Sequence, residues 1–211
     1  YMIDKKCKVC RRAGEKLFLK GERCFTPKCA MNTRAYPPGK LDSEKKHKSS
    51  TSEYGFQMKE KQKIKNIYGI SEKQFLGYVK GSEKVAAINK IHPTLAIYVG
   101  LESRLDNVVF RMGLAKSRSL ARQIVSHGHV LVNGKKLNVA SHKVRIGEVV
   151  SIREGSKSTK LFTDLQTKLK DYVTPTWMTL DLNKMEAKVT GAPKEIEAGF
   201  DFTKVLEFYN R

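Results

Sequence analysis

Four cysteines near the start of the chain constrain its folding more than any other feature. They are all the cysteines among 211 residues, and they follow the pattern C-x2-C-x13-C-x4-C at Cys7, Cys10, Cys24 and Cys29. The segment that contains them has too few apolar side chains to bury a core of its own, so a cross-link must hold it together. A C-x2-C pair has the spacing with which a knuckle directs two thiolates at one ion.

The type of cross-link depends on the redox compartment. The start "YMIDKKCKVC" has no apolar stretch like that of a secretory signal peptide, which indicates a reducing environment. A metal site is therefore favoured over two disulfides or four unreacted thiols. Zinc is the first choice because a closed thiolate set suits it, and a 4Fe-4S cluster is the alternative. Between the cysteine pairs, "EKLFLKGERC" predicts a hairpin that turns at Lys20-Gly21.

The net charge of +20 indicates a polyanionic partner, either nucleic acid or an anionic membrane. The positive charge is concentrated in two blocks, with a surplus of 11 in residues 1–65 and of 8 in residues 103–153. Residues 156–211 are nearly balanced. No run of eighteen apolar residues could span a bilayer, and neither basic block has an apolar face to place on a membrane surface. Two nucleic-acid-binding surfaces are the favoured interpretation.

Residues typical of turns, loops and helix caps divide the first half of the chain. "YPPGK" ends the first block, and the polar residues 41–53 predict a loop that is disordered or ordered only by a partner. A lysine-rich helix is expected near residues 56–66. Ser71 and Gln74 form a capping box for a further helix, which is expected to end at about Val79.

The second half begins with clear helical periodicity. From Thr94 one apolar stripe continues to Met112, and Gly113 supplies a stop. Ser117 begins the next helix and Gly128 ends it. Asn133-Gly134 predicts a hairpin, and a second is expected to turn at Ile146-Gly147. After these strands, we expect a helix near residues 161–172 and a strand in "PTWMTLDL".

Arginines line the solvent side of the two helices in residues 103–152. Asp106 and Glu148 are the only acids in that unit, so its arginines are expected to lack partners within it and to bind RNA instead. Replacing both Arg118 and Arg122 by Glu should then abolish RNA binding without unfolding the protein. The candidate RNA-binding residues are Arg11, Arg12, Lys16, Lys20, Arg23, Lys28, Arg34, Lys59, Lys63, Arg104, Arg111, Lys116, Arg118, Arg122, His127, His129, Lys135 and Lys136.

Together these motifs resemble one known family. "LKGERCFTPKCA", "YPPG", "SRLDNVVFRMGLAKSRSLARQIVSHGHVLVNGKKL" and the closing "EFYNR" are similar, in this order, to bacterial-type small ribosomal subunit protein number four. The resemblance implies an α+β fold with a mostly helical body, an N-terminal metal knuckle and an inserted RNA-binding module of two helices plus short antiparallel strands. The expected divisions are a four-cysteine metal-binding segment (1–40), a basic loop and helical region (41–102), the small module (103–165) and a C-terminal segment that packs back on the body (166–211).

The resemblance also implies a function. Such a protein is a structural component of the small ribosomal subunit that binds 16S-type rRNA early, helps to nucleate assembly, lies near the mRNA entry side and contributes to translational accuracy. Its implied partners are this rRNA, neighbouring ribosomal proteins (number five first among them) and mRNA, with no membrane and no small-molecule substrate. The family holds zinc or an iron–sulfur cluster on cysteines that match the four here. The implied location is the cytoplasmic ribosome, with an organellar ribosome as the alternative.

Two other classes are weighed against this interpretation. The tripeptide Arg104-Leu105-Asp106 resembles one in pseudouridine synthases, but no set of acid, base and nucleophile accompanies it, so catalysis is not expected. No nucleotide-binding motif supports a synthetase. A free-standing RNA-binding regulator or chaperone would consist of little more than the small module, whereas this chain adds a knuckle and a C-terminal segment.

Overall fold

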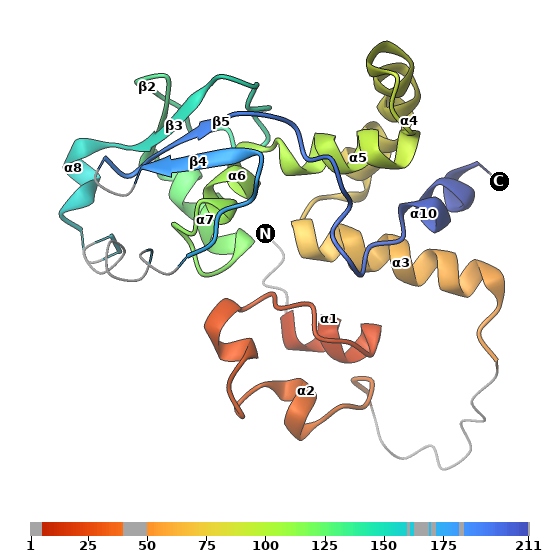
Figure 1. Cartoon of the computed structure of the whole chain (residues 1–211). Helices are drawn as coiled ribbons and strands as arrows, with labels where there is room; N and C mark the ends of the chain where they lie inside the picture. The colour runs from red at the N-terminus through yellow and green to blue at the C-terminus, as the bar shows by residue number, and fades with distance from the viewer. Residues whose placement is uncertain are drawn as a thin grey trace. The chain divides into compact units, whose positions relative to one another are not determined.

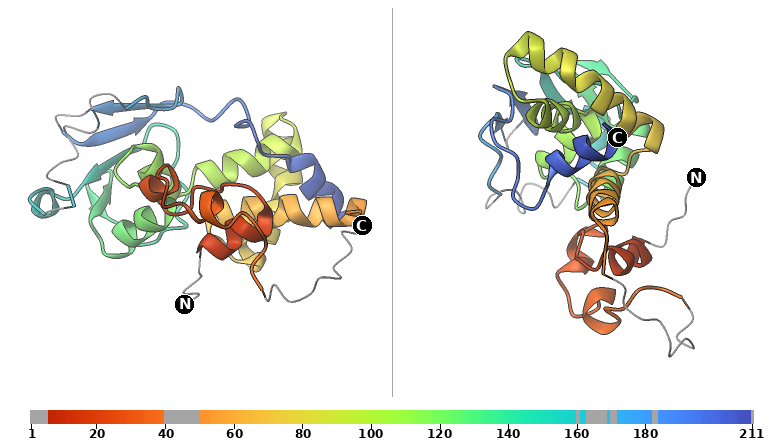
Figure 2. Two further views of the ribbon diagram at one scale, coloured as in Figure 1. Left: turned by 90° about the horizontal axis from the view of Figure 1, so that it is seen from below. Right: turned by 90° about the vertical axis from the view of Figure 1, so that its right-hand side faces the viewer.

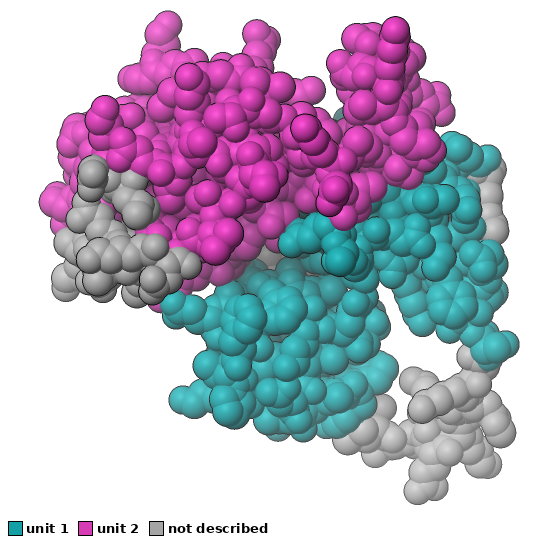
Figure 3. Space-filling view, viewed as in Figure 1, with its two compact units in different colours: residues 1–79, 197–211 teal, residues 80–196 magenta. Residues whose placement is uncertain are grey.

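The computed structural model describes residues 6–39, 50–159, 161–162, 169, 172–181 and 184–210. Two compact units divide the chain, residues 1–79 with 197–211 and residues 80–196 (Figure 3). Most of the expected loop at residues 41–53 and of the expected helix at residues 161–172 lies outside the described residues. In the parts that are described, no helix is both long enough and apolar enough to cross a membrane.

The N-terminal segment, residues 6–39, consists of short turns of helix around a very small interior. Its elements are α1 (Lys6–Ala13), η1 (Gly21–Cys24) and α2 (Ala30–Thr33). The predicted hairpin is wrong, since no strands pair within this segment. The chain does turn at Gly21, which has φ +62° and donates to the carbonyl of Phe18, but it continues as a 3-10 turn that ends at Cys24. That local turn supplies the backbone hydrogen bonds that strand pairing would otherwise have provided.

The rest of the first unit is helical, and the capping chemistry explains where its helices begin. Its elements are α3 (Glu53–Tyr68), the first part of α4 (Glu72–Asn89) and α10 (Phe202–Tyr209). The hydroxyl of Ser52 accepts from the Gly55 N–H, and Gly69 ends α3 in the left-handed conformation at φ 62°. The capping box is confirmed, because Ser71 and Gln74 exchange two bonds of 3.3 Å.

The helix α10, close to the C-terminus, packs along α3, and both views agree on this (Figures 1 and 2). Ile64, Phe75, Phe202 and Val205 are at most 1% exposed and form the core of this unit. The prediction that the capped helix ends at about Val79 is wrong, since α4 continues to Asn89. Each glycine inside α4 costs only about 1 kcal/mol, which good helix formers on both sides offset.

After the end of α4, the second unit has two helices where the sequence predicted one continuous apolar stripe. They are α5 (Pro93–Glu102) and α6 (Leu105–Arg111), and α7 (Arg118–Ser126) follows. Arg104 is extended at the break (φ −65°, ψ 138°) and forms a β-bridge with Lys143. The Leu105 N–H donates to the carbonyl of His142, so a neighbouring segment satisfies the first free donor of α6. The apolar stripe is therefore real but is bent at Ser103-Arg104.

An antiparallel sheet completes the second unit, in the order β2-β1-β3-β5-β4. Its strands are β1 (Val130–Val132), β2 (Lys135–Lys136), β3 (Val149–Ile152), β4 (Met178–Asp181) and β5 (Glu186–Val189), with α8 (Glu154–Lys157) after β3. The Asn133-Gly134 hairpin is confirmed, and both residues have the positive φ of a primed turn. The chain also turns at Ile146-Gly147, but the second predicted hairpin is wrong, because β3 pairs with β1 and β5.

Apolar residues from α6, α7 and the sheet form one core, and the two helices lie against one face of the sheet (Figure 1). The structure distributes the segment 166–211 between the two units. Its strand in "PTWMTLDL" is confirmed as β4, which joins the sheet together with β5. Its last helix, α10, instead packs against α3 in the first unit. The predicted mixture of helices with a small antiparallel sheet is confirmed.

Candidate nucleic-acid interface

Two buried carboxylates organise the arginines of the helix pair α6–α7. The side chains of Asp106 and Glu102 are 4% and 0% exposed. Asp106 accepts from Arg104 at 3.0 and 2.9 Å and from Arg122 at 2.9 and 2.6 Å. A buried carboxylate is tolerated only when it is paired and hydrogen-bonded, and both oxygens of Asp106 meet this condition.

Glu102 is the acidic partner of Arg111 and Arg118. It accepts from Arg111 at 2.8 and 3.1 Å and from the amide of Asn107 at 2.9 Å. Arg118 approaches the same carboxylate at 3.8 Å and donates to Asn107 Oδ1 at 2.8 Å. Its guanidinium also lies 4.5 Å from the centre of the Phe110 ring. Each guanidinium is therefore held in one orientation rather than sampling many rotamers.

The expectation that these arginines lack acidic partners within the unit is wrong. Glu102 was not counted as an acid of the module because it precedes residue 103, yet from the end of α5 it pairs with Arg111 of α6. Asp106 pairs with two arginines, Arg104 and Arg122. Glu102 and Asn107 were missed as site residues. The signal that could have found them is a single acid at the end of the otherwise apolar "LAIYVGLE", nine residues before Arg111.

The four arginines differ in how much of each side chain reaches solvent. Arg104 is 3% exposed, so its guanidinium is enclosed by the fold. Arg111 and Arg118 are 16% and 18% exposed, and Arg122 is 34% exposed. Arg122 therefore keeps the largest part of its side chain available to a ligand while Asp106 fixes its direction.

The hairpin end of the module is more open. Lys116, His127, Lys135 and Lys136 are exposed. His129 is half-buried, and its Nδ1 lies 2.9 Å from Ser156 Oγ. At Gly128, φ is +75° and a Cβ would meet Lys136 Cε at 2.3 Å, so the lysine stem lies directly over the turn.

In the first unit, the predicted cations of the N-terminal segment are mostly exposed. Arg11 is the exception, because its Nε donates to the Tyr36 carbonyl at 2.9 Å and its guanidinium lies 4.7 Å from the ring centre of the same residue. It thereby holds the Tyr36-Pro37 corner against α1. The exposed members are Arg12, Lys16, Lys20, Arg23, Lys28 and Arg34.

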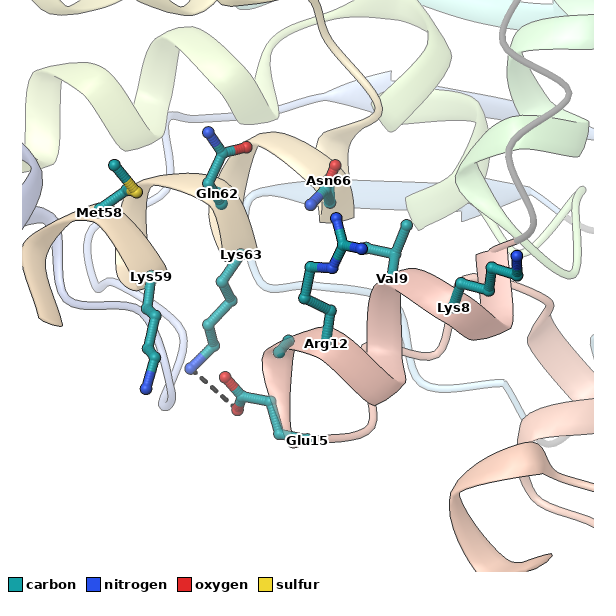
Figure 4. A pocket seen from close by; sticks show the side chains of 10 residues that line it. Lys8, Val9, Arg12, Glu15, Met58, Lys59, Gln62, Lys63 and Asn66 are labelled. Atoms are coloured by element: carbon teal, nitrogen blue, oxygen red, sulfur yellow. Dashed lines mark ion pairs between the residues drawn. The ribbon is translucent and has the colours of Figure 1, made fainter. Parts of the chain in front are cut away.

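A groove of about 600 Å³ lies between α1 and α3 and brings three predicted cations together (Figure 4). Lys63 forms an ion pair of 3.1 Å with Glu15 across it. Lys8, Gln62 and Asn66 also line the groove and were missed by sequence reasoning. The lining residues are Lys8, Val9, Arg12, Ala13, Glu15, Met58, Lys59, Gln62, Lys63 and Asn66.

The four cysteines line one small cavity of about 20 Å³. Cys10, Cys24 and Cys29 are buried, Cys7 is half-buried, and all four are free thiols. Burial raises the pKa of Cys10, a backbone hydrogen bond from Leu17 lowers it, and the other three thiols raise it further. Within the described residues, no group of three His, Cys, Asp or Glu side chains is positioned to hold a metal ion as it stands. The four thiols line this cavity together, and thiolates are the donors that zinc and iron–sulfur clusters take.

Comparison with known proteins gives matches over nearly the whole chain. Residues 2–92 match the family model "Ribosomal protein S4/S9 N-terminal domain", and residues 103–150 match the "S4 domain". The chain is 45% identical over 207 residues to the small ribosomal subunit protein uS4 of Halothermothrix orenii, covering 97% of this chain and 96% of that protein. It is 41% identical over 210 residues to uS4 of Syntrophomonas wolfei, covering 99% and 98% of the two chains. The uS4 protein of Caldicellulosiruptor saccharolyticus is 42% identical over 211 residues, with the same coverage.

Proposed function

The chain belongs to the small ribosomal subunit protein uS4 family, and from that premise we propose that it is a structural protein of the small ribosomal subunit that binds small-subunit rRNA. Identity of 45% across 97% of the chain is the observation that carries this function. The relatives are structural ribosomal proteins rather than enzymes, so the chain is assigned no catalytic step. The family also accounts for both basic blocks at once, whereas a free-standing RNA chaperone accounts only for the module.

The cations of each unit would bind the phosphate backbone of the rRNA. In the second unit Arg111, Arg118 and Arg122 are held in fixed directions, and Lys135 and Lys136 of the hairpin are exposed. Paired bases in A-form RNA are hidden in a deep, narrow groove, so such a set recognises the shape of a helical junction rather than a sequence. Its affinity should fall steeply with salt, because each neutralised phosphate releases a counterion.

The finer role follows from the family. The protein would bind 16S-type rRNA early and help to nucleate assembly of the subunit. In the assembled ribosome it would lie near the mRNA entry side, contact ribosomal protein number five and contribute to translational accuracy. The cytoplasmic ribosome is the proposed location, and an organellar ribosome is the alternative.

The cysteines would hold a structural metal. Cys7, Cys10, Cys24 and Cys29 line one cavity, and zinc is preferred over a 4Fe-4S cluster because a closed thiolate set suits it. When bound, the metal supplies a cross-link that replaces the missing apolar core of residues 6–39. The thiols hold the segment in shape, while the exposed lysines and arginines between them make the contacts with RNA.

The direct test is filter binding of the full chain to a 16S-type rRNA transcript over a range of salt concentrations. We expect tight binding, with a logarithmic salt slope of about −0.9 for each phosphate contact. An unrelated RNA of equal length is the control. Equal affinity for both RNAs, or no co-sedimentation with small subunits in moderate salt, would refute the proposal. Metal analysis of the purified chain tests the zinc site separately.

A further inference from the structure

The N-terminal segment exposes its two largest apolar side chains, although it has almost no core. Phe25 is 76% exposed and Phe18 is 46% exposed. Their rings stack on each other with centroids 4.9 Å apart and an interplanar angle of 28°. The stack leaves most of the Phe25 ring in solvent. A segment so short of apolar burial would gain stability by enclosing these rings, so their exposure calls for an explanation by binding.

Both exposed phenylalanines directly follow buried residues. Leu17 and Cys24, the residues immediately before the two phenylalanines, are 6% and 8% exposed. In each case the buried residue is followed directly by the exposed phenylalanine. Phe18 also has φ +50°, a left-handed conformation that costs a non-glycine residue on the order of 1 kcal/mol or more. The chain therefore accepts strain at the residue that supports the Phe25 ring.

The surroundings of the aromatic pair are strongly basic. In the sequence Lys16 and Lys20 flank Phe18, while Arg23 and Lys28 flank Phe25, and all four are exposed. They outnumber the two exposed acids of the same stretch, Glu15 and Glu22. An exposed aromatic ring between cations is the combination with which proteins bind unpaired nucleic acid, since the base stacks on the ring and the cations neutralise its phosphates. An acidic protein partner would use the cations but would gain little from a flat ring face held open by a second ring.

We propose that Phe25, backed by Phe18, is a stacking platform for one unpaired base of small-subunit rRNA. This rests on the proposed function and names the element of the RNA that the N-terminal segment recognises: an unstacked base in a loop, bulge or junction rather than a paired helix. The cysteine cavity fixes the platform, because Cys24 is joined directly to Phe25. Stacking on the platform adds affinity that salt does not screen, in contrast to the lysine and arginine contacts around it.

The first test measures the affinity of full-length variants for the 16S-type rRNA transcript. Phe25→Ala should weaken binding by about 5- to 150-fold, the range for loss of one stacked base, with an unchanged salt slope. Phe25→Trp, which keeps an aromatic ring at this position, should bind the transcript about as tightly as the wild type does. Ile88→Ala is the matched control, since Ile88 is 81% exposed and lies on α4. It should bind as the wild type does.

The second test reports stacking directly. In a Trp177→Phe background the indole of Phe25→Trp is the sole tryptophan, and its fluorescence should be quenched when the transcript binds. Unquenched fluorescence in a saturated complex would overturn the stacking proposal, as would wild-type affinity of Phe25→Ala. Normal rRNA binding by Phe25→Ala combined with its loss from whole small subunits would assign the platform to a protein neighbour instead. Failure of the wild-type chain to bind the transcript would refute the proposed function itself.

Discussion

The N-terminal segment and the α6–α7 pair both present cations, but they hold them in opposite ways. Residues 6–39 have almost no core, and most of their lysines and arginines are exposed. The helix pair rests on a large apolar core, and its arginines are directed by Asp106 and Glu102 beneath them. One region would be ordered by a metal and the other is ordered by buried carboxylates. The two regions should therefore respond to different perturbations.

The largest effect is expected from removing Asp106. Asp106→Ala leaves the guanidinium of Arg104, 3% exposed, without its carboxylate, and breaking a buried pair from one side costs about 3–5 kcal/mol. Denaturant unfolding followed by Trp177, which lies in the second unit, measures this cost. Glu154→Ala is the matched control, because Glu154 is 86% exposed in its pair with Lys157 and should cost less than about 0.5 kcal/mol. Equal losses in the two variants would remove the distinction between buried and exposed carboxylates.

The second perturbation concerns the thiols. Cys24→Ser should release bound zinc or iron and make residues 6–39 readily cleaved by trypsin, while residues 103–152 stay protected. Loss of an outer partner of a metal ligand costs roughly 10- to 100-fold in affinity, and loss of a ligand itself costs more. Thr33→Ala, in the same segment, is the control and should retain the metal. Proteolysis that cut both regions alike would contradict the independent ordering of the two.

The third perturbation separates charge from structure within the module. Lys135→Gln with Lys136→Gln should leave the free energy of unfolding unchanged, because both side chains are exposed on β2. The logarithmic salt slope of rRNA binding should become shallower by about two, one unit for each phosphate contact. Isothermal titration at several salt concentrations gives this slope. An unchanged slope would show that the hairpin does not contact the RNA backbone.

The double variant of Lys135 and Lys136 replaces the double variant of Arg118 and Arg122 that the sequence alone favoured. Reversing Arg118 and Arg122 to Glu was expected to spare the fold, on the assumption that neither arginine had a partner. Since Arg122 contacts the buried Asp106, a glutamate there would face an enclosed carboxylate, and the fold would be lost together with RNA binding.

Local signals in the sequence predicted local structure well. The Ser71–Gln74 capping box, the Ser117 cap and the Asn133-Gly134 turn are each set by residues a few positions apart, and all three are confirmed. What could not be predicted depends on distant partners. The helical stripe breaks at Ser103-Arg104, where Arg104 forms a β-bridge with Lys143. In the same way, β3 pairs with β5 across about forty residues. The burial of Glu102 likewise follows from how α5 meets α6.

The smallest effect concerns an ion cluster in the first unit whose carboxylate is exposed, although its Lys61 is buried. Glu72 is 45% exposed and accepts from Lys61 at 2.7 Å, Lys65 at 2.9 Å and the Tyr209 hydroxyl at 2.6 Å. Partial burial raises its pKa, but the hydrogen bonds from Lys61, Tyr209 and Lys65 outweigh burial and lower the pKa of Glu72 to about 2. A depressed pKa in the folded state means that the stabilisation is present above the ordinary value of 4.5 and is lost as the pH falls toward 2.

We therefore expect Glu72→Gln to lower the free energy of unfolding by less than about 1 kcal/mol at neutral pH, since solvent screens the exposed carboxylate. The buried Lys61 also keeps a second partner, because its Nζ lies 4.3 Å from the centre of the Phe208 ring. The difference between this variant and the wild type should shrink as the pH falls below 4.5 and vanish near 2. Thermal unfolding followed by circular dichroism at a series of pH values measures it, with Lys204→Ala, in the exposed Asp201 pair, as the control. A loss as large as that of Asp106→Ala would mean that the number of partners, rather than burial, sets the value of a carboxylate in this protein. Burial of the carboxylate is the stronger factor, because solvent cannot replace a lost partner of Asp106 or Glu102, whereas solvent reaches the exposed Glu72.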